Sequence, residues 1–147
     1  MLLRKIKEYG EVQLYLESLE HIKRNIKNKQ LQIQQLQEQT ESITYTLKQD
    51  FVRGGKLHGG FADSVSKIVD LQFAINTDIY QLVTTMKDIT IRIDNMFCDY
   101  PDLANLLTLR YVNGLGWETV CEELHCSSAT VYRLHTQALK NFKNYMP

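Results

Sequence analysis

Two long stretches of the chain repeat apolar residues at alternating spacings of three and four. They are residues 11–53 and 61–100, and neither contains glycine or proline. Apolar residues at this spacing lie along one side of an α-helix and form the seam of a coiled coil. No stretch shows the strict alternation of apolar and polar residues that is typical of a half-buried strand. The pattern predicts an all-α protein with two long helices.

The two predicted helices have matched lengths. The first covers residues 12–47 and the second residues 64–97, which is about 54 Å and about 51 Å at ~1.5 Å per residue. We expect them to pair as an antiparallel coiled-coil hairpin, with Asp63 or Ser64 capping the start of the second helix. The predicted seam consists of Val12, Tyr15, Leu19, Ile22, Ile26, Lys29, Ile33, Leu36, Thr40, Ile43 and Leu47 in the first helix, and of Val65, Ile68, Gln72, Ile75, Ile79, Leu82, Met86, Ile89, Ile93 and Met96 in the second.

The segment between the predicted helices, FVRGGKLHGGF, is rich in glycine. A phosphate-binding loop would follow a strand and place a lysine directly after its last glycine. Neither condition holds, so we expect a connecting loop at about residues 48–62. The paired hairpin leaves some apolar residues outside its seam, which favours self-association as a homo-oligomer such as a dimer. These residues include Leu14, Leu16, Leu71 and Phe73.

The C-terminal part of the chain predicts three shorter helices. Pro101 suits the first turn of the first helix, and Gly114 is placed to end it. The second begins near Trp117, and Ser127 or Ser128 caps the third. Two short helices joined by a tight turn, after a leading helix, form a helix-turn-helix. We expect the buried positions to be Leu103, Leu106, Leu107, Leu109, Tyr111, Val112, Trp117, Val120, Cys121, Leu124, Val131, Leu134, Ala138, Leu139 and Phe142.

The run from Leu107 to Leu139 resembles a known family. Its pattern, L-x-L-R-Y-V-x-G-L-x-W-E-T-V-x-E-E-L-x-x-S-x-x-T-V-Y-R-L-H-x-x-A-L, is similar to the fourth region of bacterial sigma-70-type factors, which reads the promoter −35 element. The whole chain resembles small phage and prophage proteins described as sigma-like late-gene regulators. It departs from the sigma pattern at His125, where the turn usually has a glycine that relieves left-handed backbone strain. The heptad seams predict a long helical hairpin at residues 1–98, with oligomerisation as its expected role, and the resemblance implies a sigma-like helix-turn-helix domain at residues 99–147.

Such a domain inserts the exposed N-terminal half of its second helix into the major groove of double-stranded DNA. Arg133 could donate two hydrogen bonds to guanine or bind a phosphate, and Ala129 could meet a thymine methyl group. Lys140 and Lys143 would suit backbone phosphates. The predicted DNA-binding residues are Ser128, Ala129, Thr130, Tyr132, Arg133, Thr136, Lys140 and Lys143.

Charge limits how strongly the chain can bind DNA. Its 17 basic and 17 acidic side chains cancel, so any attraction to nucleic acid or to anionic lipid must be local. Residues 124–147 hold three basic groups and no acidic one, whereas Glu118, Glu122 and Glu123 precede them. Neutralising about three phosphates gives weak binding by a monomer. We therefore expect dimerisation, or RNA polymerase as a further partner.

Composition also bears on location. The longest apolar runs, such as residues 73–75, are far shorter than the roughly 20 residues that span a bilayer, so no membrane segment is predicted. The charged start has no apolar signal region, and secretion is not indicated. Three cysteines, an odd number, then suggest reduced thiols. We expect a cytoplasmic protein of a bacterial host.

No catalytic or metal site is predicted. Cys121, His125 and Cys126 are fewer than the four ligands of structural zinc, and Cys121 lies on an apolar helix face. His135 is expected to pack at the base of the third helix, as the resemblance implies. No set of nucleophile, base and orienting group is suggested, so we expect no cofactor and no enzymatic activity. Two alternatives to a transcription regulator stay open: a phage structural or packaging component resembling a small terminase subunit, and a module that docks on RNA polymerase without reading DNA.

Overall fold

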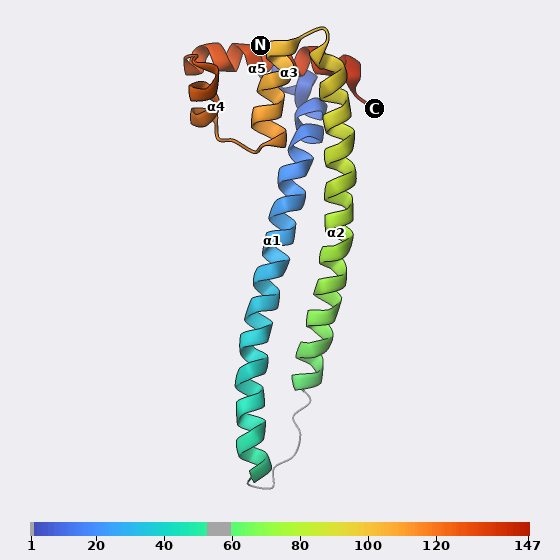
Figure 1. Ribbon diagram of the computed structural model, residues 1–147, viewed down its shortest axis with the longest axis vertical. Coiled ribbons are helices and arrows are strands. Elements are labelled where there is room, and N and C mark those ends of the chain that lie inside the picture. Colours follow the sequence, from blue (N-terminus) through green and yellow to red (C-terminus); the bar gives the residue numbers. More distant parts are fainter. Residues whose placement is uncertain (1, 53–59) are drawn as a thin grey trace. The chain divides into compact units, whose positions relative to one another are not determined.

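The computed structural model describes residues 2–52 and 60–147, and the described residues form helices without any strand (Figure 1). This confirms the predicted all-helical class. None of these helices is both long enough and apolar enough to cross a membrane. The elements are α1 (Leu2–Val52), α2 (Gly60–Phe97), α3 (Pro101–Leu107), the π-helix η1 (Thr108–Val112), α4 (Trp117–Leu124), α5 (Ser128–Phe142) and the 3₁₀-helix η2 (Lys143–Tyr145).

Both long helices extend into the stretch assigned from the sequence to a loop. α1 continues to Val52 and α2 begins at Gly60, which leaves residues 53–59 of the predicted loop outside the described residues. Neither of the two predicted capping residues, Ser64 or Asp63, therefore caps α2: both lie within the helix, Asp63 in its first turn. The Asp63 carboxylate still suits the positive end of the helix dipole.

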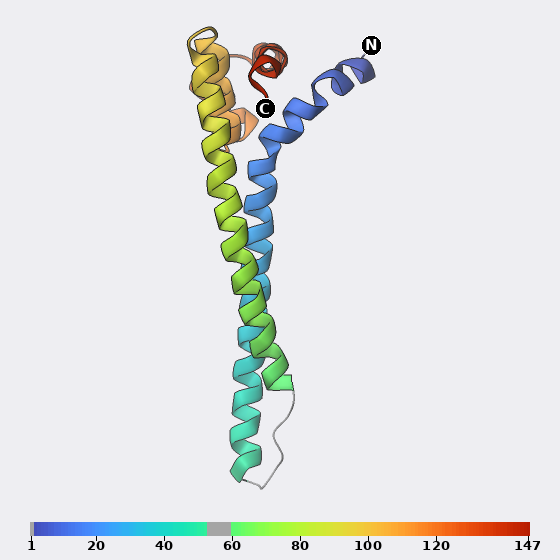
Figure 2. The ribbon, with the colours of Figure 1, turned by 90° about the vertical axis from the view of Figure 1, so that its right-hand side faces the viewer.

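Contacts divide the chain into two compact units. Unit 1 combines Met1–His21 with Leu82–Pro147, and unit 2 is Ile22–Gln81. The boundary predicted between residues 98 and 99 stays a prediction. In unit 2 the two long helices run antiparallel, side by side in both views (Figures 1 and 2). Lys29 Nζ of α1 lies 2.5 Å from Asp78 Oδ2 of α2, and Asn25 Nδ2 donates to the same oxygen at 3.3 Å.

The predicted seam of α1 is confirmed at every position whose side chain the structure describes, Val12 through Thr40, because all are buried or partly buried. The predicted seam of α2 is wrong at three positions. Val65 and Ile79 are 40% and 43% exposed, and Gln72 is exposed. The residues that face inward in their place are Ser64, Leu71 and Asp78.

This shift has a physical cause at Lys29. A lysine at a seam position needs a partner for its charge, and Asp78 provides it. The side of α2 that carries Asp78 therefore faces α1 in unit 2. From Asp78 the inward positions continue at Leu82 and then at Met86, so that two spacings of four follow one another. From Leu82 onward the inward residues are those that the heptad pattern predicted. A second spacing of four in succession is called a stutter of the heptad repeat.

The core of unit 1 is assembled from distant parts of the chain. Leu16 and Leu19 of α1, together with Ile93 and Met96 of α2, are buried against the C-terminal helices. Trp117 is partly buried and packs at the edge of this core. Each fully buried side chain of this size contributes about 1.5–3 kcal/mol by leaving water. The buried members from the C-terminal helices are Leu103, Ala104, Leu106, Leu107, Tyr111, Val120, Val131, Ala138, Leu139 and Phe142.

A π-helical turn separates α3 from the segment that leads to α4. The Asn113 amide donates to the Thr108 carbonyl oxygen, five residues earlier, at 2.9 Å. Gly114 follows with a φ of +70° and ends the helix, as predicted. Glycine takes up this left-handed conformation without a steric penalty. The turn leaves Tyr111 pointing into the core, where it is 8% exposed.

Candidate nucleic-acid interface

The exposed face of α5 gathers most of the residues predicted to bind DNA. Ser128, Tyr132 and Thr136 recur every fourth residue along α5, so they lie on one side of the helix. Thr130 is the exception, because it is partly buried. This face is the candidate interface. Its exposed members from the predicted set are Ser128, Ala129, Tyr132, Arg133, Thr136 and Lys140, with Lys143 exposed in η2.

The start of α5 is fixed by a local cap. Ser127 has extended backbone angles, and its Oγ accepts a hydrogen bond from the Thr130 amide at 3.3 Å. The side-chain hydroxyls of the same two residues lie 3.0 Å apart. Of the two predicted capping residues, Ser127 is therefore the one that caps. The bonds to Ser127 also hold the Thr130 hydroxyl at the end of the candidate interface.

The turn before α5 has a left-handed residue. His125 has φ 53° and ψ 39°, and it is the only residue other than glycine with a positive φ in the described ranges. Its amide donates to the Glu122 carbonyl oxygen at 3.2 Å, and the Cys126 amide donates to the Cys121 carbonyl oxygen at 3.1 Å. These two bonds form the Schellman motif that ends many helices. The backbone thus adopts the conformation that was expected to favour glycine at position 125.

Aromatic stacking supports the middle of the interface. Tyr132 is 62% exposed, and its ring stacks on Trp117 with centroids 5.9 Å apart and planes at 21°. The Arg110 guanidinium carbon lies 4.8 Å from the centre of the Trp117 ring, and Arg110 Nη1 donates to the Leu115 carbonyl oxygen at 2.8 Å. Cation–π and ring contacts of this kind each contribute about 0.5–1.5 kcal/mol. Tyr132 is therefore held in place by α4 and η1.

A buried polar pair lies on the inner side of α5. His135 is 8% exposed, and its Nε2 lies 2.7 Å from the hydroxyl oxygen of Tyr111. Burial, and then the charge of Arg110, lower the pKa of His135 to about 4, while burial raises the pKa of Tyr111. Both side chains are neutral near pH 7. His135 is buried, as predicted, but it lies near the middle of α5 and not at an end of the helix.

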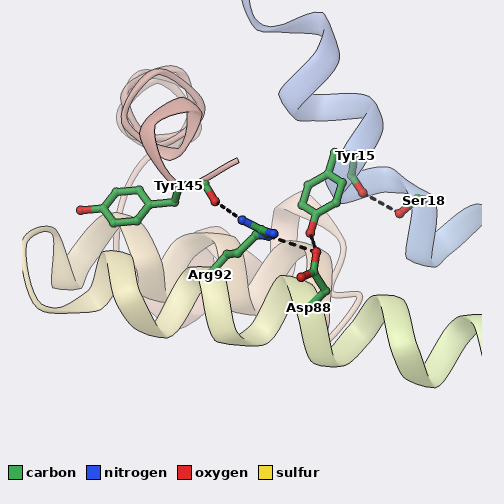
Figure 3. A network of polar contacts seen from close by, with 5 residues as sticks. All are labelled: Tyr15, Ser18, Asp88, Arg92 and Tyr145. Carbon is green, nitrogen blue, oxygen red and sulfur yellow. Dashed lines mark hydrogen bonds and ion pairs between the residues drawn. The ribbon is translucent and has the colours of Figure 1, made fainter. Parts of the chain in front are cut away.

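The C-terminal end of α5 is held by polar contacts that the sequence did not predict, although Tyr15, one of the residues involved, was predicted as a seam residue. Arg92 of α2 contacts the Tyr145 carbonyl oxygen and the Asp88 carboxylate, and Asp88 accepts a hydrogen bond from Tyr15 of α1 (Figure 3). The only local signal was the Asp88–Arg92 spacing of four, which is common on exposed helices. The other contacts join residues 53 and 73 positions apart. Sequence spacing alone cannot reveal such pairs.

Charges of opposite sign lie on the two neighbouring helices. Arg133, Lys140 and Lys143 are exposed on α5 and η2. On α4 the exposed charges are the carboxylates of Glu118, Glu122 and Glu123. Within the described residues no three histidine, cysteine, aspartate or glutamate side chains gather as a metal site. The exposed face of α5, continued by η2, therefore presents hydroxyl, guanidinium, ammonium and aromatic groups to a binding partner.

These features define an all-helical protein with two long helices and a short C-terminal helical bundle. The chain belongs to the DUF1492 family, described as a protein of unknown function, whose match covers residues 43–143. The matched range includes every predicted DNA-binding residue. No curated protein and no solved structure matches the chain.

Proposed function

We propose that this protein is a sequence-specific, DNA-binding transcription regulator of phage or prophage origin. In this proposal α4 and α5 form a helix-turn-helix of the sigma region-4 type, and α5 is the helix that reads the major groove. The observation that carries the proposal is the exposed face of α5, whose polar and basic residues follow a capped turn. Helix-turn-helix proteins read bases with the N-terminal residues of this second helix.

The proposal gives most residues of the predicted interface a role. Arg133 donates to guanine O6 and N7, and Ala129 meets a thymine methyl group. Ser128 and Thr130 offer hydroxyl groups near the start of α5, the end that enters the groove. Lys140, farther along α5, and Lys143 in η2 bind phosphates and set the position on the duplex. The protein acts by binding, without catalysis or a cofactor.

Three exposed basic groups limit the affinity of a single copy. The proposal therefore includes a homo-oligomer formed through the long helices. Of the four residues expected to need cover, Leu14 and Phe73 are 64% and 75% exposed. The expectation was wrong for the other two, because Leu16 is fully buried in unit 1 and Leu71 is partly buried within the chain. Burying such side chains between copies would add binding energy that the DNA contacts alone do not supply.

A second candidate is a module that docks on RNA polymerase without reading DNA. The acidic side of α4 favours it, because Glu118, Glu122 and Glu123 are all exposed and would repel phosphates. A packaging component of a phage particle is a third reading. Both the docking module and the packaging component are distinguished from a regulator by whether the protein binds one DNA sequence in preference to others.

The deciding experiment is selection of bound fragments from random duplex DNA by the intact protein. An enriched motif supports the regulator. No duplex binding at about 50 mM salt, together with association with RNA polymerase or a capsid component, replaces it with one of the other readings.

Two substitutions then separate base reading from phosphate binding. We expect Arg133→Ala to cost about 1–3 kcal/mol on the selected site and to reduce preference among sites. Lys143→Ala should weaken binding to all duplexes alike and lower the salt slope by roughly one. Binding is measured by fluorescence anisotropy at several salt concentrations. Arg24→Ala, at an exposed position of unit 2, is the control and should change neither quantity. Equal losses on all duplexes for Arg133→Ala would reject its role as a base reader.

A further inference from the structure

The C-terminal end of α5 is held by a side chain from another helix. Arg92 Nη1 donates to the Tyr145 carbonyl oxygen at 2.8 Å, while Arg92 Nε donates to Asp88 Oδ2 at 3.0 Å (Figure 3). Tyr145 belongs to η2, which directly continues α5. The last carbonyl groups of a helix lack partners within the helix and carry partial negative charge. Arg92 thus supplies a cationic cap from α2.

The same arginine is connected to α1. Asp88 accepts a hydrogen bond from the Tyr15 hydroxyl, and the Tyr15 ring stacks on Phe142 of α5 with centroids 6.2 Å apart. Burial, and then the bond to Asp88, raise the pKa of Tyr15 to about 12. The hydrogen bond from Arg92 lowers the pKa of Asp88 below its usual value. Near pH 7 the phenol is neutral and the carboxylate is charged, so both bonds are retained.

A second tie reaches the same end of the helix. The Tyr145 hydroxyl donates to Asp99 Oδ2 at 2.5 Å, and Asp99 lies just beyond the end of α2. All these contacts lie within unit 1. They fix the end of α5 that is remote from the predicted base contacts.

We propose that Arg92 is a positioning residue for the DNA contacts of α5, an inference that rests on the proposed function. A helix of the length of α5, Ser128–Phe142, is about 22 Å long at ~1.5 Å per residue, so a rotation of about 10° at its C-terminal end moves its N-terminal end by about 4 Å. Binding groups must be held within about 0.5 Å of their productive positions. The anchored C-terminal end therefore directs Ser128, Ala129 and Arg133 toward the bases.

The bridge depends on the guanidinium group. Arginine presents donors in a fixed planar fork, so it can bond Asp88 and Tyr145 at the same time, whereas lysine offers a compact charge on a flexible stem. Arg92→Lys keeps the charge but not the two-sided geometry. Tyr15→Phe keeps the ring that stacks on Phe142 and removes only the hydroxyl that contacts Asp88. These variants disturb the position of α5 with little change in apolar packing.

The first test compares affinity for the selected duplex with affinity for an unrelated duplex. Arg92→Ala and Arg92→Lys should each lower this ratio about tenfold, the cost of one misplaced base contact. The salt slope should stay the same because the phosphate-binding lysines remain. Gln13→Ala, which removes a hydrogen bond within α1, is the control. A purely stabilising role of Arg92 would leave the ratio unchanged well below the unfolding temperature, and that result overturns the inference.

The second test needs no DNA. Residual dipolar couplings of the intact protein report the directions of amide bonds in α5 and in residues 82–97 of α2. In the unsubstituted protein one alignment should fit both segments, and in Arg92→Lys the couplings of α5 should no longer fit it. An unchanged fit overturns the positioning role even if DNA binding is found. Failure of the unsubstituted protein to bind any duplex rejects the proposed function instead.

Discussion

At the scale of single residues, His125 has a left-handed backbone conformation that favours glycine over residues with a Cβ atom. Its φ of 53° places it in the left-handed region, which costs most residues roughly 1–2 kcal/mol and glycine very little. We expect His125→Gly to raise the free energy of unfolding by about 0.5–1 kcal/mol, because the greater freedom of glycine in the unfolded chain offsets part of the gain. Thermal unfolding followed by circular dichroism would show this as a midpoint roughly 1–4 °C higher. His125→Ala keeps a Cβ atom and should give no increase; an equal gain would point to the side chain instead of the backbone.

His135 makes the stability of the protein depend on pH. Its pKa is lowered from 6.5 to about 4 in the folded state, so the unfolded state binds a proton that the folded state excludes. The stabilisation is complete above about pH 6.5 and is lost as the pH falls toward 4, with a total of about 3 kcal/mol. Glu17 raises the pKa while burial and Arg110 lower it, and the lowering prevails.

Unfolding by denaturant at several pH values checks this expectation. Trp117 is the only tryptophan, and its ring centre lies 4.6 Å from that of His135, so its fluorescence reports on the pair. His135→Gln keeps a hydrogen-bonding side chain but cannot titrate. Between pH 7.5 and 5 this variant should lose less stability than the unsubstituted protein. Identical pH profiles for the two proteins would contradict a neutral buried His135.

At the scale of helices, apolar periodicity predicted the long pair well because burial repeats every third and fourth residue on a helix. Apolar periodicity failed where a charged residue decides which side of the helix faces inward. Periodicity treats Ile79 as a better seam residue than Asp78, but the ion pair with Lys29 turns Asp78 inward. A pattern on one helix cannot show which residue of the other helix lies opposite.

Ile75 and Ile79 form a matched pair that tests the observed register of α2. Ile75 is 8% exposed and Ile79 is 43% exposed. Ile75→Asp should cost about 3–5 kcal/mol because it buries an unpaired charge. Ile79→Asp should stay within about 0.5 kcal/mol, as is usual for surface substitutions. Urea unfolding measures both, and a larger loss for Ile79→Asp would restore the register predicted from the heptad pattern.

The exposed face of α5 was also predictable, because inward residues such as Val131 and Ala138 fix the phase of this short helix. The tertiary contacts that hold this face in place were not predictable from the sequence. Arg110 is one of several similar basic residues in the sequence, and its contact with Trp117 depends on the path of the chain through η1 and the turn that follows. Local patterns identify which side of a helix is exposed, whereas tertiary contacts decide what holds it.

At the scale of the whole molecule, the chain closes one core from widely separated segments. Residues near its start, such as Leu16 and Leu19, and Phe142 of the last α-helix are all fully buried in unit 1. The sequence predicted the inward residues of the C-terminal helices, but it did not indicate that α1 would cover them. The missing information is long-range contact, which a repeat of three and four residues does not contain.

This closure constrains the order of events during synthesis. About 120 residues separate Leu19 from Phe142, and a ribosome adds roughly 5–20 residues per second. The apolar side of α1 in unit 1 therefore waits about 6–25 s for the helices that cover it. Contacts between such distant segments slow folding because a long loop must close first. Until α5 has emerged from the ribosome, the newly made chain exposes the apolar side of α1, which favours aggregation. The yield of folded protein in the cell then depends on what covers this side of α1 before α5 is made.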